Sequence, residues 1–131
     1  MAAAYRVAEP PMRKMDPVPA FVSASGNAVG TAEDAMRAAH GIFSTRFLRP
    51  VSRAQLIRVR WDEQNYALGG RVHTIGNQRW AWEEGRVSGY RALIAQNQAR
   101  DETIVIFNNR EIEQSVIAGW TESIVRASAA I

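Results

Sequence analysis

The sequence contains no cysteine, a single lysine (Lys14) and only two histidines, His40 and His73. The absence of cysteine excludes a disulfide scaffold, a thiolate metal site and a cysteine nucleophile. With so few histidines, a histidine-based metal site is nearly excluded as well, and we expect no cofactor. Because Pro11 stands three residues before the only lysine, the sequence contains no Ser-x-x-Lys motif.

Long hydrophobic runs are also lacking, so the sequence predicts no membrane span, and its first residues lack the order of a signal peptide. We therefore expect a cytoplasmic protein as the chain is written, or a periplasmic or extracellular one if it belongs to a longer exported protein. The net charge is only +3, and the arginines are scattered from Arg6 to Arg126. Such scatter argues against nucleic acid as a partner.

The composition is typical of one compact folded domain: of 131 residues, 47% are hydrophobic and 22% are charged. All but one of the five prolines lie within residues 1–22. Proline removes a backbone donor and holds the preceding residue extended. We therefore predict an irregular arm over residues 1–22, either laid over the fold or disordered, and a domain over residues 23–131.

The first half of this domain shows helical spacing of its apolar residues. The spacing predicts a helix over residues 32–43, with Thr31 as its N-cap. A second short helix is expected after Pro50, capped by Ser52 and burying Leu56 and Ile57.

From Tyr66 the apolar period changes to that of strands. One strand is predicted over residues 66–75, with a bulge at its Gly-Gly pair. Three more are predicted over residues 79–83, 89–96 and 103–107. The short turns between them favour antiparallel neighbours.

A last amphipathic helix is predicted after Asn108 or Asn109, with Trp120 in the core. Its apolar stripe consists of Ile112, Val116, Ile117, Trp120, Ile124 and Ala127. The fold class is therefore α+β, with an antiparallel sheet of about four strands packed with two N-terminal helices and a C-terminal amphipathic helix.

No strong catalytic constellation is visible in the residues alone. Glu83 and Glu84 are adjacent carboxylates, which on a strand point to opposite faces and so do not form an acid/base dyad. Trp80 and Trp82 share one strand face and form either an aromatic ligand platform or part of a core or interface. His73 either titrates near neutral pH or has a structural role.

Five segments nevertheless occur in an order typical of one family. They are Gly26-Asn-Ala-Val-Gly-Thr-Ala-Glu-Asp34, Phe47-Leu-Arg-Pro-Val-Ser52, Tyr66-Ala-Leu-Gly-Gly70, Trp82-Glu-Glu-Gly-Arg-Val-Ser-Gly-Tyr-Arg-Ala92 and Asp101-Glu-Thr-Ile-Val-Ile-Phe-Asn-Asn109. In this order they resemble the C-terminal part of serine β-lactamase-related proteins, which include class C β-lactamases, esterases and penicillin-binding proteins. The resemblance covers roughly residues 20 to 130 and implies a partial β-lactamase/transpeptidase-like fold.

The resemblance also implies where a site would lie. In this family, the serine of a Ser-x-x-Lys motif forms an acyl-enzyme, and a Lys/His-Ser/Thr-Gly motif borders the site. That third motif falls on Glu83, Glu84 and Gly85, and the backbone N–H of the oxyanion hole falls on Arg86. Glu83 thus replaces the family's cation. The expected ligand-edge residues are Trp80, Trp82 and Tyr90.

These observations favour a C-terminal fragment or split part of a β-lactamase-related serine hydrolase that has no catalytic residue of its own and is inactive alone. Its partner would be the missing N-terminal part or a second copy in a dimer. The alternative is a non-catalytic binding or scaffold module that uses the half-fold to bind a partner or a small ligand. An active enzyme that uses Glu83, Glu84 or His73 is a third hypothesis, without a visible base–nucleophile pair.

Overall fold

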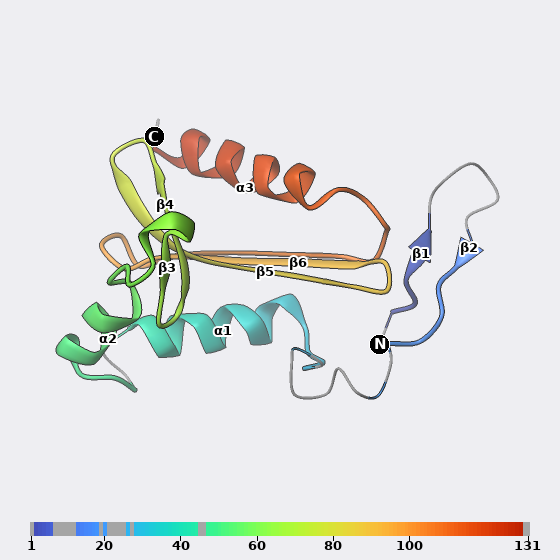
Figure 1. The fold of residues 1–131 in the computed structure, drawn as a ribbon, viewed down its shortest axis with the longest axis horizontal. Coiled ribbons are helices and arrows are strands. Elements are labelled where there is room, and N and C mark those ends of the chain that lie inside the picture. The colour runs from blue at the N-terminus through green and yellow to red at the C-terminus, as the bar shows by residue number, and fades with distance from the viewer. Residues whose placement is uncertain are drawn as a thin grey trace.

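The computed structural model describes residues 2–6, 13–18, 20, 26, 28–44 and 47–129. Its main sheet is antiparallel with the strand order β3-β4-β5-β6-β7. Helix α1 (Ala32–Phe43) packs on one face of this sheet and α3 (Gln114–Ser128) on the other (Figure 1). The five strands are β3 (Tyr66–Ala67), β4 (Gly70–Ile75), β5 (Gln78–Val87), β6 (Tyr90–Asn97) and β7 (Glu102–Asn108). The predicted α+β class is confirmed, and the sheet has one strand more than predicted.

The additional strand comes from the glycine pair. The single strand predicted over residues 66–75 is instead a hairpin, in which Ala67 pairs with Gly70 around the turn Leu68–Gly69. Gly70 has a φ of +121°, and a Cβ atom there would lie 2.6 Å from Glu83 Oε2. Because only glycine adopts this conformation freely, the pair reverses the chain rather than forming a bulge.

The two N-terminal helices begin for different reasons. Thr31 Oγ1 accepts a hydrogen bond from the Asp34 N–H, and the Asp34 carboxylate accepts one from the Thr31 N–H, both 3.1 Å long. This capping box confirms the predicted cap and bounds of α1. Helix α2 (Pro50–Leu56) starts at Pro50 and has no side-chain cap, so the cap predicted at Ser52 is wrong. The fixed φ of proline suits a first helical position.

Helix α3 covers the main hydrophobic core. It begins at Gln114, after Glu113 and not after Asn108 or Asn109 as predicted, and no side chain caps it. Its buried residues are Ile117, Thr121 and Val125. They lie over a cluster that contains Ile75, Trp80, Trp82, Leu93 and Ala95. The prediction that Trp120 is a core residue is wrong, since 49% of its surface is exposed.

Part of the proline-rich arm is ordered as short strands. Strand β1 (Tyr5–Arg6) pairs with β2 (Arg13–Lys14), which the sequence did not predict. The Tyr5 N–H donates to the Asn109 carbonyl and the Tyr5 carbonyl accepts from the Glu111 N–H, each at 2.8 Å. Tyr5 of the arm therefore pairs with the segment that follows β7, and β1 and β2 form a separate two-stranded sheet there (Figure 1).

Candidate functional site

Strand β5 is paired with a neighbour on both sides only at Ala81 and Trp82. Strand β6 pairs with β5 from Ala81 to Val87, whereas the pairing with β4 ends where Arg71 faces Trp82. Among the residues that the structure describes, none pairs with Glu83–Val87 on the β4 side. We call this segment the open edge of β5. It contains all four residues onto which the family resemblance places the third motif and the oxyanion N–H.

The register determines which backbone groups face outward. The two-residue turn Ser88–Gly89, with φ of +42° and +80°, is closed by the pair Val87 and Tyr90. The pair that closes such a turn exchanges hydrogen bonds, and bonded and non-bonded pairs then alternate along the strands. The N–H and C=O groups of Glu84 and Arg86 consequently point away from β6, toward the open edge.

The two adjacent carboxylates lie on opposite faces of the strand, as predicted. The Tyr66 hydroxyl donates to Glu83 Oε2 at 3.4 Å on one face. On the other face, the indole N–H of Trp82 donates to Glu84 Oε1 at 2.8 Å. Since different partners hold them on different faces, they do not form a carboxylate dyad.

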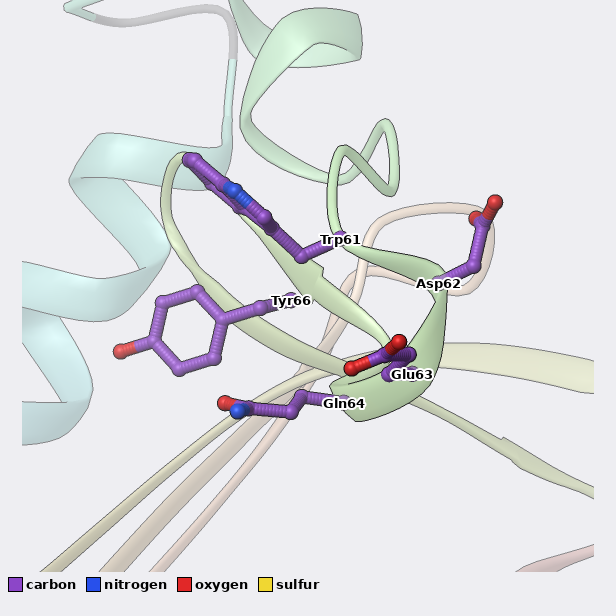
Figure 2. Close-up of a pocket in the computed structure, with 5 residues that line it drawn as sticks. All are labelled: Trp61, Asp62, Glu63, Gln64 and Tyr66. Atoms are coloured by element: carbon purple, nitrogen blue, oxygen red, sulfur yellow. The ribbon is translucent and has the colours of Figure 1, made fainter.

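Next to β3 lies an open hollow of about 710 Å³, lined by Trp61, Asp62, Glu63, Gln64 and Tyr66, and Glu83 contacts it through the Tyr66 hydroxyl. Figure 2 shows the Trp61, Gln64 and Tyr66 side chains extending in the same direction, whereas the Asp62 carboxylate points away. The ring centroids of Trp61 and Tyr66 are 6.4 Å apart, in an edge-to-face arrangement. We call this feature the Trp61–Tyr66 hollow.

The loop that carries these aromatic residues is held by its own backbone. Trp61 and Tyr66 form an isolated antiparallel bridge, with N–H donation in both directions at 3.1 Å. Between them the short 3-10 helix Asp62–Gln64 ends at Asn65, whose φ of +50° is left-handed. The Asn65 carbonyl accepts from the Val72 N–H at 2.8 Å. These bonds fix the two rings relative to β4.

A second, smaller pocket of about 250 Å³ lies on the α3 side of the open edge. It is lined by Arg71, Glu84, Gly85, Arg86 and Gln114. Gln114, the first residue of α3, donates through Nε2 to the Ala92 carbonyl at 3.1 Å. Arg71 connects the two pockets, because its guanidinium carbon also lies 5.1 Å from the centroid of the Tyr66 ring.

The structure corrects the position of two expected ligand-edge residues. Trp80 and Trp82 are each 1% exposed and belong to the core under α3, so the ligand-platform interpretation is wrong for both. Tyr90 is half-buried, and its hydroxyl donates to the Ala2 carbonyl of the arm at 2.6 Å. From the sequence, the two tryptophans could form either a ligand platform or part of a core or interface. The structure places them in the core, because α3 covers that face of the sheet.

His73 has a structural setting. Its ring stacks on that of Trp82 at 4.5 Å between centroids, with an angle of 11° between the planes. Burial lowers the pKa of His73 below its usual value, while the charges of Glu84 and Glu122 oppose this shift and Arg71 adds to it. No nucleophile is seen against the ring among the described residues.

Sequence reasoning missed Trp61, Tyr66, Arg71 and Gln114 as site residues. The sequence pattern indicates no site in residues 61–65, which are mostly polar, and it predicts Tyr66 as the start of a strand. The available signal was two aromatic residues, Trp61 and Tyr66, separated by four polar ones and followed, after two further residues, by a glycine pair.

A metal-ligand cluster and a membrane-spanning helix are both absent from the described residues. These residues contain no group of three or more potential ligand side chains that could hold a metal ion. No helix within them has the length and apolar character needed to cross a membrane.

Comparison of the chain with protein-family models, with curated proteins and with solved structures found no match.

Proposed function

We propose that this chain is the C-terminal, sheet-bearing part of a β-lactamase-related serine hydrolase, in which the open edge of β5 borders the substrate site. The observation that carries the proposal is that, among the described residues, β5 has no partner on its β4 side where the resemblance places the family's third motif. The edge runs from Glu83 to Val87; residues 84–86 line the smaller pocket, and Glu83 contacts Tyr66 of the Trp61–Tyr66 hollow.

An open strand edge is suited to an extended, amide-like substrate. Outward N–H and C=O groups can pair with the backbone of such a substrate, in the manner of an added strand. The Arg86 N–H would also lie at hand for an oxyanion, because hydrogen-bond donors aimed at developing negative charge stabilise the tetrahedral intermediate of acyl transfer. The nucleophile must come from another segment, since the sequence contains no Ser-x-x-Lys.

Two uncovered surfaces support the need for another segment. Val116, Trp120 and Ile124 form an exposed apolar stripe along α3, each more than 40% exposed. Strand β7 is the last strand of the sheet in the described part of the chain. An apolar stripe and an unpaired strand edge are both typical of surfaces that a further element covers.

The test uses a fluorophosphonate and a fluorescent penicillin, both of which label activated serines covalently. We expect no labelling of this chain alone. We expect labelling when it is produced together with the polypeptide encoded directly upstream, with the label on that polypeptide. Labelled serine within this chain would contradict the proposal, as would an upstream product that stays unlabelled in the presence of the chain.

A matched pair of variants tests the assigned N–H. Arg86→Pro removes the donor, and because this N–H points away from β6 no ladder bond is lost. We expect it to slow labelling by about 10²–10³-fold, whereas Arg86→Ala, which keeps the N–H, stays close to the unsubstituted rate. Circular dichroism checks that both variants are folded. Equal labelling rates for the two variants would show that the Arg86 N–H has no role in the reaction.

A second candidate function is a non-catalytic binding module, and the Trp61–Tyr66 hollow is the observation that favours it. Aromatic walls that stay open to solvent are typical of ligand sites. Ligand binding in the hollow together with no labelling under any of the conditions above would favour this alternative.

A further inference from the structure

We propose that the Trp61–Tyr66 hollow binds a cationic group, of the alkylammonium type, on the ligand of this site. As a statement about substrate class the proposal rests on the proposed function, but cation binding itself can be measured without any hydrolase activity.

The walls of the hollow are the first reason. Trp61 is 57% exposed, although an indole is a large apolar group that proteins usually cover. Its ring and that of Tyr66 stand edge to face at 6.4 Å. The face of an aromatic ring carries negative charge density and attracts ammonium groups, most strongly for tryptophan. Arg71 already lies 5.1 Å from the centroid of the Tyr66 ring, so one cation occupies this ring while Trp61 stays open to another.

The charge around the hollow is the second reason. Glu83 lies beside the Tyr66 hydroxyl, and Glu63 lines the hollow. In the part of the chain that the structure describes, the ion pairs involve other acids, and neither Glu63 nor Glu83 is within ion-pair distance of a basic side chain. The two carboxylates are therefore not neutralised by an ion pair, although Arg71 lies over the Tyr66 ring, in a chain whose net charge is +3.

Glu83 is exposed, and two neighbours lie beside its carboxylate. A Cβ atom on Gly70 would lie 2.6 Å from Glu83 Oε2, so the glycine leaves the space that the carboxylate occupies. The Tyr66 hydroxyl holds the same oxygen. Together with the hydrogen-bonded loop 61–66, this arrangement exists before any ligand arrives, which lowers the entropic cost of binding.

The negative charge of Glu83 also disfavours binding of an anionic ligand group. The resemblance places a cation of the family's third motif at Glu83, where it would hold a negatively charged substrate group. A carboxylate there repels an anion and attracts a cation. Aromatic walls and a carboxylate together form the kind of cage that recognises ammonium groups.

The experiment compares choline with its neutral isostere, 3,3-dimethylbutan-1-ol, on the full chain. Binding is followed by NMR through the indole N–H signals of ¹⁵N-labelled tryptophan, assigned with Trp61→Phe. We expect choline to shift the Trp61 signal in a saturable way, with about tenfold weaker binding of the neutral isostere. Equal binding of both probes, or no shift of the Trp61 signal up to about 50 mM choline, at which millimolar binding would saturate, would overturn the proposal.

Variants locate the site. Trp61→Ala is expected to abolish the binding measured by ligand-observed NMR, and Glu83→Gln to weaken it about fivefold. Trp120→Ala and Glu113→Gln are the matched controls, since they remove an exposed indole and an exposed carboxylate elsewhere, and should leave choline binding unchanged. Unchanged affinity in Glu83→Gln would contradict the role of its charge.

The outcomes are separable from those of the labelling test. Choline binding at Trp61 without serine labelling refutes the hydrolase and leaves the cation site standing. Serine labelling without choline binding supports the hydrolase and refutes the cation site.

Discussion

At the scale of single residues, His73 shows how the environment sets a charge. Its ring lies against Trp82, and burial lowers the pKa of the imidazole from its usual 6.5. Glu84 on β5 and Glu122 on α3 favour the charged form, whereas Arg71 on β4 disfavours it. Since burial is the largest of these effects, the folded protein prefers neutral His73.

The sign of the pH dependence follows from this preference. The unfolded chain binds a proton at His73 near the usual pKa of about 6.5, and the folded chain binds it only at lower pH. The stability that His73 contributes is therefore complete above about pH 6.5 and is lost as the pH falls from there toward the folded pKa. We expect the Tm of the protein to fall between about pH 7.5 and 5.5, and to fall less in His73→Gln.

Thermal melts followed by circular dichroism over this pH range check the prediction. His40→Gln is the control, because His40 pairs with Asp101 at 3.1 Å on the other side of the sheet and has no contact with Trp82. If the curves of Tm against pH are parallel for the unsubstituted protein and His73→Gln, burial of the His73 ring does not cause the fall in Tm.

Some residue-level features were predictable from the sequence and others were not. Opposite faces for Glu83 and Glu84 follow from strand alternation alone, and the structure confirms them. The fate of Trp80 and Trp82 depends on α3, which lies more than thirty residues later in the sequence, so local pattern left it undecided.

At the scale of elements, α3 presents apolar residues on two neighbouring faces. The buried face is Ile117, Thr121 and Val125, and the exposed one is Val116, Trp120 and Ile124. Both have the same four-residue spacing. The sequence favoured the line through Trp120 because Thr121 is polar. In the structure Thr121 Oγ1 donates to the Ile117 carbonyl at 3.0 Å. This bond offsets the free-energy cost of burying the hydroxyl group.

This difference between faces predicts a difference between two similar substitutions. Ile117 is 0% exposed and Ile124 is 47% exposed. We expect Ile117→Ala to lower the free energy of unfolding by about 2–5 kcal/mol, the range for truncating a buried isoleucine, and Ile124→Ala to lower it by less than about 0.5 kcal/mol, as is usual for surface changes. Urea unfolding curves of both variants measure the two values, and equal losses would contradict the assigned faces.

Helix starts were predictable only where the cap is local. The capping box of α1 joins residues three positions apart, so the sequence contains both partners. The start of α3 was misplaced: Asn109 lies in the segment before the helix, where its side-chain amide donates to the Ala3 carbonyl of the arm at 2.8 Å, and α3 begins only at Gln114. Likewise the two-residue turn at Leu68–Gly69 was missed, although a left-handed Gly70 fits a hairpin.

At the scale of the whole molecule, β7 leaves one side of the sheet open. The same alternation that applies to β5 places the N–H and C=O groups of Thr103, Val105 and Phe107 on the outer side of β7. In the described chain, the arm pairs with this side only beyond the end of β7, where Tyr5 bonds to Asn109 and Glu111. The open stretch is uncharged between Glu102 and Arg110.

An uncharged open edge predicts self-association of the isolated chain. We expect analytical ultracentrifugation at about 10 µM, a concentration at which exposed edges commonly associate, to show species heavier than the 14.6 kDa monomer. Phe107→Lys, which puts a charge on the open stretch, should shift the distribution toward monomer. Leu68→Lys charges another exposed apolar residue, 60% exposed against 46% for Phe107, at the opposite edge of the sheet and should not.

A monomeric unsubstituted chain, or equal effects of the two lysine variants, would show that β7 is not the associating edge.

The central claim is that this sheet belongs to a serine hydrolase whose nucleophile lies in another segment, and the most direct test is to sequence the DNA upstream of the Met1 codon. The account predicts Ser-x-x-Lys followed by the second motif of the resembled family, Tyr-x-Asn or Ser-x-Asn, which assists proton transfer there, in a reading frame that joins this one or is offset from it by one base. Stop codons and a start signal directly upstream, with neither motif in any frame, would contradict it.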